Sequence, residues 1–330
     1  MSLDDWEGFD EWQASDATLH GWSANPASLQ TGRFGGQCAR WASNATTTYG
    51  IKVPGVRQTI GIAWRTSNAG GACTVMDLRE GGTTHGRLAY NGNGTFTVSR
   101  NGTTFGATPT TPNLGIAGNT WYYLEFDYLC DDSTGAYELK VNGVTVASGT
   151  GDSRNGGTGV LNTLVIVTPT GGVAVLDWDD MYMASGSTSF QGDCRVITAV
   201  PNSDGASAQW TPSTGTAHYA VVDEIPQNGD TDYVSSATVG HRDTYGMPAL
   251  GVTGTVVGVM VQAMARKDDA GTRTLALPVR SGGTDYVDAG QPLVSTYTPI
   301  KRLLLTDPDT GSAWTVGGVN AAEVGVQVVA

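Results

Sequence analysis

The spacing of apolar and polar residues along the chain predicts many short β-strands. Residues 121–129 (WYYLEFDYL) give the clearest pattern, because Tyr122, Leu124, Phe126 and Tyr128 all fall on one face. A period of two is typical of a strand with one buried face, whereas an amphipathic helix repeats every three to four residues. We therefore expect this segment to be a strand whose even-numbered side chains line a core.

Similar segments occur on both sides of this one. They combine β-branched or aromatic residues with flanking Gly, Asn and Asp turns. In the first half the predicted strands cover 58–65, 73–79, 87–90, 95–100, 136–141, 144–147, 162–167 and 173–183. In the second half they cover 195–200, 218–223, 254–266, 273–280 and 300–305, with a turn at 201–205 and a short helical turn entering a last strand within 319–326. Residues 254–266 are apolar almost throughout; their length would also suit a helix, but two Gly and four Val favour a strand buried on both faces.

The order of these elements predicts an all-β protein of two domains. About ten strands at short spacing before residue 186 are typical of a two-sheet jelly-roll sandwich. Residues 184–189 (ASGSTS) are small and mostly polar, as expected between domains. We therefore expect one sandwich over residues 1–186 and a second β-sandwich, with the role of an assembly domain, over residues 187–330.

Charge and hydropathy narrow the classes of partner. The formal net charge is −13, with 18 Lys and Arg against 31 Asp and Glu. An acidic surface disfavours nucleic acid and anionic membranes. No apolar run approaches the length of a membrane-spanning helix, and the acidic start lacks the features of a signal peptide. We expect a protein made in the cytoplasm, with no nucleic acid partner and no membrane insertion.

Several motifs together resemble a known family. They are the Arg-Phe-Gly-Gly turn at 33–36, Glu-Leu-Lys-Val-Asn-Gly at 138–143, Asp-Trp-Asp-Asp-Met-Tyr at 177–182, the junction at 190–224 and the ending at 307–325. In this order they resemble tailed-bacteriophage virion structural proteins, in which a concanavalin A-like (laminin-G-like) jelly roll precedes a C-terminal β-domain. No single motif is specific; their order and spacing carry the resemblance.

The resemblance implies a function, partners and a location. It implies a non-enzymatic structural protein on the surface of the virion, as a fibre, spike or decoration protein that is able to adhere to host-surface glycans. Its partners would be other virion proteins of the head or tail and further copies of itself, with a trimer favoured. Two alternatives remain open: a free carbohydrate-binding module or lectin, and a glycoside hydrolase.

Candidate chemistry in the sequence is sparse. Trp64, Trp121 and Trp210 are candidate platforms for sugar rings, although aromatic residues at alternating strand positions more often lie in a core. Glu125 and Asp127 share the non-core face of residues 121–129, side by side at a strand spacing of roughly 6.5–7 Å. A glycosidase acid needs a raised pKa, and nothing in the sequence supplies an apolar pocket for either residue. We expect both to be solvated and ionised, and no hydrolase activity.

Three other acids and the cysteines complete the candidates. A Ca²⁺ ion, which needs six or more oxygen ligands, could be held by Asp177, Asp179 and Asp180. The favoured interpretation is that these acids cap loop amides or are solvated. The four cysteines include no CxxC pair and are expected to be reduced. No catalytic residue, cofactor or metal ligand is assigned from the sequence.

Overall fold

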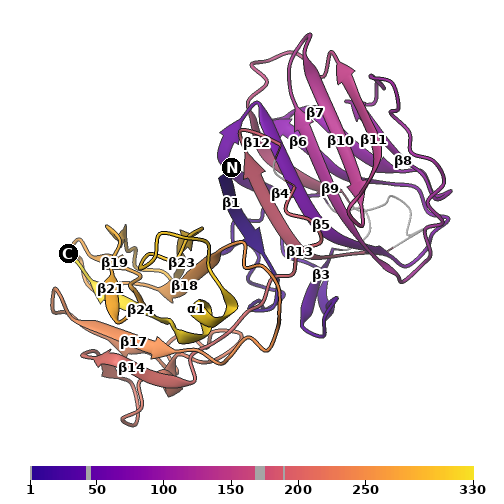
Figure 1. Cartoon of the computed structure of the whole chain (residues 1–330). Coiled ribbons are helices and arrows are strands. Elements are labelled where there is room, and N and C mark those ends of the chain that lie inside the picture. The colour runs from indigo at the N-terminus through magenta and orange to yellow at the C-terminus, as the bar shows by residue number, and fades with distance from the viewer. Residues whose placement is uncertain (1, 42–45, 168–174, 189) are drawn as a thin grey trace. The chain divides into compact units, whose positions relative to one another are not determined.

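The computed structural model describes residues 2–41, 46–167, 175–188 and 190–330 and confirms the all-β fold class (Figure 1). The chain divides into two compact units, residues 1–196 and 197–330. The boundary therefore lies later than the sequence indicated, because residues 187–196 belong with the first unit. No helix among the described residues is long and apolar enough to cross a membrane.

The first unit is a sandwich of two antiparallel sheets (Figure 1). An eight-stranded sheet has the order β11-β10-β9-β5-β13-β3-β2, with β1 paired to β13, and a five-stranded sheet has the order β4-β12-β6-β7-β8. The strands of the larger sheet are β1 (Ser2–Glu7), β2 (Ser28–Thr31), β3 (Gln37–Trp41), β5 (Arg57–Thr66), β9 (Trp121–Leu129), β10 (Gly135–Val141), β11 (Val144–Gly151) and β13 (Leu176–Ser185). Those of the smaller sheet are β4 (Thr46–Gly55), β6 (Cys73–Glu80), β7 (Thr83–Tyr90), β8 (Phe96–Arg100) and β12 (Leu161–Val167).

The core of this unit confirms the face assigned to residues 121–129. Leu124, Phe126 and Tyr128 of β9 are fully buried in the main hydrophobic cluster, and Tyr122 packs against its margin. Large aromatic side chains dominate the cluster, and each removes a large apolar area from water. The other face of β9 therefore points away from the core, on the outer side of the eight-stranded sheet.

The second unit has its own core, one seven-stranded sheet and two pairs of strands. A seven-stranded sheet has the order β14-β17-β24-β19-β22, with β20 paired to β24 and β21; β15 pairs with β16, and β18 with β23. The elements are β14 (Ser203–Ala208), β15 (Thr211–Pro212), η1 (Tyr219–Val221), β16 (Val234–Ser235), β17 (Arg242–Gly246), β18 (Val259–Ala265), β19 (Thr274–Ala276), β20 (Val279–Ser281), β21 (Thr284–Tyr286), β22 (Gln291–Pro292), β23 (Thr298–Leu304), α1 (Val316–Ala321) and β24 (Glu323–Val328). Leu275, Leu277, Val279 and Trp314 are among the residues of the core.

Several predictions in the second half are wrong, and the structure gives the reasons. Residues 195–200 form no strand, and the backbone amide of Val196 bonds to the Asp180 side chain where a strand partner was expected. The predicted turn at 201–205 overlaps β14, and the predicted strand at 218–223 contains the short helix η1. Residues 254–266 form a strand only from Val259, and this strand is mostly half-buried, since it pairs with β23 alone. The helical turn and final strand near the C-terminus are confirmed.

Candidate functional site

Strand register places a row of polar side chains across the outer face of the eight-stranded sheet. Thr59 of β5 lies opposite Asp127 of β9, Asp127 opposite Glu138 of β10, and Glu138 opposite Ser148 of β11. Residues directly opposite one another in antiparallel strands point to the same face. Three consecutive strands, β9 to β11, and the sequence-distant β5 therefore build one continuous polar row.

Asp127 is buried and is bound by two neighbouring side chains. Its carboxylate is 1% exposed, accepts a bond of 2.6 Å from Arg57 Nη2 and is also bound by Arg57 Nε at 3.1 Å. Thr59 Oγ1 donates a further bond of 2.8 Å. A buried carboxylate needs such partners, because its desolvation is costly. The expectation that Asp127 is solvated is therefore wrong.

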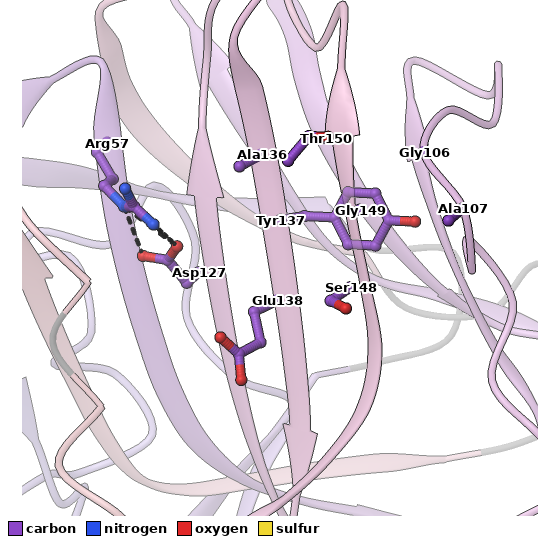
Figure 2. A pocket seen from close by; sticks show the side chains of 10 residues that line it. All are labelled: Arg57, Gly106, Ala107, Asp127, Ala136, Tyr137, Glu138, Ser148, Gly149 and Thr150. Atoms are coloured by element: carbon purple, nitrogen blue, oxygen red, sulfur yellow. Dashed lines mark hydrogen bonds and ion pairs between the residues drawn. The ribbon is translucent and has the colours of Figure 1, made fainter.

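A pocket of 520 Å³ opens beside this row (Figure 2). Its wall includes the Arg57–Asp127 ion pair on one side and Glu138 and Ser148 on the other, as the close-up shows. Glu138 is half-buried and accepts a bond of 2.6 Å from Thr145 Oγ1. The remaining lining residues are Gly106, Ala107, Ala136, Tyr137, Gly149 and Thr150.

The loop that closes one side of the pocket is fixed to β11. Thr108 Oγ1 donates to the carbonyl of Ser148 at 2.7 Å, and the amide of Ser148 donates back at 3.2 Å. Gly106 has a φ of +79°, and a Cβ there would lie 2.8 Å from the Gly149 Cα. Glycine at both positions permits this close approach of two backbones. The pocket wall is thus a built feature of the fold.

Next to the pocket, residues 190–196 lie across the outer face of the sheet, and we call them the covering segment. The amide of Gly192 donates to Glu125 Oε1 at 2.8 Å, and the hydroxyl of Tyr182 donates to the same oxygen at 2.6 Å. The amide of Gln191 donates to the Tyr182 hydroxyl at 3.0 Å. Glu125 is 1% exposed, so the expectation that it is solvated is also wrong.

Charged groups hold both ends of the covering segment. At one end, Lys140 Nζ lies 4.0 Å from the centre of the Phe190 ring, a cation–π arrangement. At the other end, Arg33 pairs with Asp193 at 2.5 Å and donates to the carbonyl of Cys194 at 3.3 Å. The covering segment therefore occupies the middle of the polar face, and the pocket near β10 and β11 is the part that remains open.

The three acids of β13 act as internal hydrogen-bond acceptors. Asp177 pairs with Arg40 and with Arg65, each at 2.6 Å. Asp179 accepts the amide of Arg33 at 2.7 Å, and Asp180 accepts the amide of Val196 at 2.8 Å. Burial raises the pKa of both Asp179 and Asp180 above the ordinary value. These contacts support the capping interpretation over the solvated one.

The three tryptophans predicted as sugar platforms do not meet at the pocket. Trp64 is fully buried and packs against Tyr90 and Phe96, so that prediction is wrong. Trp121 is half-buried, and the Arg65 guanidinium lies 4.4 Å above its ring. Trp210 belongs to the second unit, where its Nε1 donates to the carbonyl of His241 at 3.0 Å. None of the three lines the pocket.

Sequence reasoning missed Arg57, Glu138 and Ser148. A period of two in residues 136–141 puts Glu138 on the face opposite Leu139 and Val141, and this signal could have identified it. What no local pattern could supply was the register that sets β10 beside β9 and β11.

Comparison with known proteins gives matches at the level of the fold. No family model and no curated protein matches this chain. Among solved structures, the alginate lyase Aly36B is 12% identical and aligns over 56% of this chain and 98% of its own, with a TM-score of 0.42. An endo-β-1,4-glucuronan lyase from the fungus Trichoderma reesei is 13% identical over 56% of this chain and 91% of its own, with a TM-score of 0.33. The Emp46p carbohydrate recognition domain, in a potassium-bound form, is 13% identical over 57% and 97%, with a TM-score of 0.37.

These comparisons correct the function predicted from the sequence. The similar structures include polysaccharide lyases, sialidases and a carbohydrate recognition domain, and none of those reported is a component of a phage particle. The prediction of a non-enzymatic structural protein on a virion surface is therefore contradicted, and these structures agree better with the alternatives stated beside it, a free carbohydrate-binding module or lectin and a glycoside hydrolase. At these identities the likeness shows the sandwich fold alone.

Proposed function

We propose that the first unit binds a neutral or amino-sugar-containing oligosaccharide in the pocket beside Glu138, without cleaving it. The observation that carries this proposal is the polar row of Asp127, Glu138 and Ser148 along a pocket of 520 Å³. Ligand sites in proteins are concave and hold a few well-placed polar groups. This pocket is a hollow open to solvent, and it carries such polar groups along one side of the sheet.

The chemistry of the lining suits sugar hydroxyl groups. A carboxylate such as that of Glu138 offers acceptor sites beyond the one used by Thr145, and the hydroxyls of Ser148 and Thr150 both donate and accept. Ser148 and Thr150 are exposed at the pocket wall. A ring hydroxyl placed among them would find donors and acceptors at fixed positions.

The charge of the pocket selects among carbohydrates. Arg57 is engaged by Asp127, which leaves Glu138 as the charge that faces an incoming ligand. The whole chain also carries a net charge of −13. A uronate polymer would be repelled both by the Glu138 carboxylate in the pocket and by the net negative charge of the whole chain. Neutral sugars avoid this repulsion, and an amino sugar would gain an ion pair with Glu138.

Binding without turnover is proposed because the candidate acids are occupied. A glycosidase requires one carboxyl to protonate the leaving oxygen and a second to act as nucleophile or base. Glu125 lies under Gly192 and bonds to Tyr182, and Asp127 is fixed by Arg57 and Thr59. Neither carboxylate is placed to contact a sugar in the pocket at the same time as its present partners.

The experiment is a glycan array followed by calorimetric titration of the best neutral or amino-sugar ligand. Glu138→Gln and Ser148→Ala should each weaken binding, the first by about tenfold or more, since a hydrogen bond to a charged group contributes roughly 1.5–3 kcal/mol. Asp268→Asn, at an exposed carboxylate in the second unit, is the matched control and should leave the affinity unchanged. Equal affinity for wild type and Glu138→Gln would refute the site, and cleavage of the bound glycan would refute the non-catalytic part.

A further inference from the structure

A second group of polar side chains lies where the chain leaves β1, away from the pocket residues. β1 ends at Glu7, and Phe9 then adopts a φ of 61°, which turns the chain so that Glu11 follows close to Glu7. One oxygen of Glu7, one of Glu11 and Nδ1 of His20 lie within 4.8 Å of one another. The His20 Nδ1 is 3.9 Å from Glu7 Oε2 and 3.9 Å from Glu11 Oε1.

Packing fixes two of these three side chains. Glu7 is 1% exposed and His20 is 5% exposed. The His20 ring lies beside the Trp12 ring, with centroids 4.8 Å apart, and its amide donates to the carbonyl of Ala17 at 3.1 Å. A site whose donors are held by surrounding structure loses little entropy when an ion binds.

The third side chain provides access. The Glu11 side chain is 23% exposed, so solvent reaches this edge of the group. As the most exposed of the three side chains, it can shift more readily than Glu7 or His20. Zinc bonds to nitrogen and oxygen are about 2.0–2.2 Å long, which sets neighbouring ligand atoms of a tetrahedral ion roughly 3.3–3.6 Å apart. Both carboxylates lie 3.9 Å from Nδ1, so each pair must close by about 0.3–0.6 Å to reach this range, most readily through rotation of the side chains.

The donor set decides the class of ion. Ca²⁺ and Mg²⁺ are bound through oxygen, whereas imidazole nitrogen suits Zn²⁺, Co²⁺ and related ions. One imidazole and two carboxylates also neutralise the two charges of such an ion. We propose that Glu7, Glu11 and His20 bind a divalent transition-metal ion of the Zn²⁺ and Co²⁺ class, with solvent in its remaining positions. This departs from the sequence analysis, which assigned no metal ligand.

The test uses Co²⁺ as the probe on the full chain after dialysis against a chelator. Binding should produce a visible Co²⁺ absorption band and reduce tryptophan emission, because Trp12 stacks on the ligand His20. Added Zn²⁺ should abolish the band, and Ca²⁺ at the same concentration should not. Glu11→Gln should weaken Co²⁺ binding by at least about tenfold, the scale on which changes around a metal alter affinity.

Glu80→Gln is the matched control. Glu80 also lies beside an imidazole, 3.4 Å from His85 Nε2, and its side chain is likewise 23% exposed. Among the described residues this pair belongs to no three-ligand group, so the substitution should leave Co²⁺ affinity unchanged. His20→Gln, checked for folding by circular dichroism, should remove the absorption band. The proposal fails if wild type gives no band, or if Glu11→Gln binds Co²⁺ as tightly as wild type does.

Discussion

The backbone amide of Gly192 donates a hydrogen bond of 2.8 Å to the carboxylate of Glu125, which ties the covering segment to the middle of β9. The same oxygen accepts the Tyr182 hydroxyl, so two donors meet one buried charge. Donors to an ionised group form stronger bonds than neutral pairs do. The covering segment is therefore part of the outer face, and how firmly it is held decides how far a ligand could extend from the pocket.

Asp193→Ala should loosen the covering segment. Asp193 is bound at two atoms by Arg33, and its side chain is 45% exposed; after its loss the Arg33 guanidinium still lies 3.8 Å from Asp180. A surface ion pair contributes up to about 1 kcal/mol, which corresponds to an opening equilibrium raised about two- to five-fold. The measurement is the rate at which Cys194 reacts with a thiol reagent at pH 8.

Cys194 is a suitable reporter of this opening. It is half-buried while Cys38, Cys73 and Cys130 are buried, and burial raises its pKa to about 12, so the closed form reacts slowly. Asp132→Ala, which removes another exposed partner of an arginine, is the control and should not alter the rate. An unchanged rate in Asp193→Ala would show that the ion pair does not hold the segment.

Gly61→Ala should destabilise the first unit, because the Tyr182 ring lies directly over Gly61. A Cβ at this position would come 1.9 Å from Tyr182 Cε1. The ring must then move and weaken its bond to Glu125, at a cost of about 1–3 kcal/mol, as for other overpacked sites. Urea unfolding measures the change. Gly50→Ala, where a Cβ meets nothing within 4 Å, should be close to neutral, and equal effects of the two substitutions would contradict the argument.

The sequence predicted local structure better than it predicted the site. The bounds of β9 and the face of Leu124, Phe126 and Tyr128 follow from a period of two, which any half-buried strand must show. The Arg57–Asp127 pair joins strands separated by some seventy residues, and pairing of this kind leaves no mark in either segment. The pocket depends on that pairing and could not be predicted.

The stretch from Gly192 to residue 200 shows a different limit of prediction from sequence. Residues 195–200 have the β-branched content of a strand, and their backbone is indeed not helical. β-propensity describes how well a residue fits an extended, half-buried surface, not which groups its amides will bond. Here the amides of Gly192 and Val196 bond to the carboxylates of Glu125 and Asp180 in place of a neighbouring strand.

Asp180→Asn should make the stability of the first unit less dependent on pH. Burial raises the pKa of Asp179 and Asp180, so the folded state holds their protons more tightly than the unfolded chain does. That contribution is complete at low pH, and it is lost as the pH rises from about 4 toward neutrality. Asn keeps an acceptor for the Val196 amide and tolerates the φ of 48° at this position.

Urea unfolding at a series of pH values tests this expectation. Wild type should lose stability between about pH 4 and pH 7, and Asp180→Asn should lose less and be the more stable protein at pH 8. Asp268→Asn in the second unit should retain the wild-type profile. A wild-type profile that rises with pH over this range would contradict the assigned direction.

Asp243 should be the most sensitive carboxylate of the second unit. It is fully buried and accepts the amides of Gln209 and Trp210 at 2.6 and 2.8 Å, while His218 Nδ1 lies 2.7 Å from its other oxygen. Asp243→Ala removes the acceptor of the Trp210 amide, one of two acceptors of the Gln209 amide and the partner of the His218 imidazole, and should lower the free energy of unfolding by about 3–5 kcal/mol. Asp243→Asn retains one acceptor and should cost about 1–3 kcal/mol.

Hydrogen exchange of the amides in β17 and β24 reports on this unit alone. Asp268→Ala should change that exchange by less than about 0.5 kcal/mol, as exposed substitutions do. If Asp243→Ala exchanges no faster than Asp268→Ala, the buried carboxylate does not organise the start of this unit, and the contacts of Trp210 must be held by the core of the second unit instead.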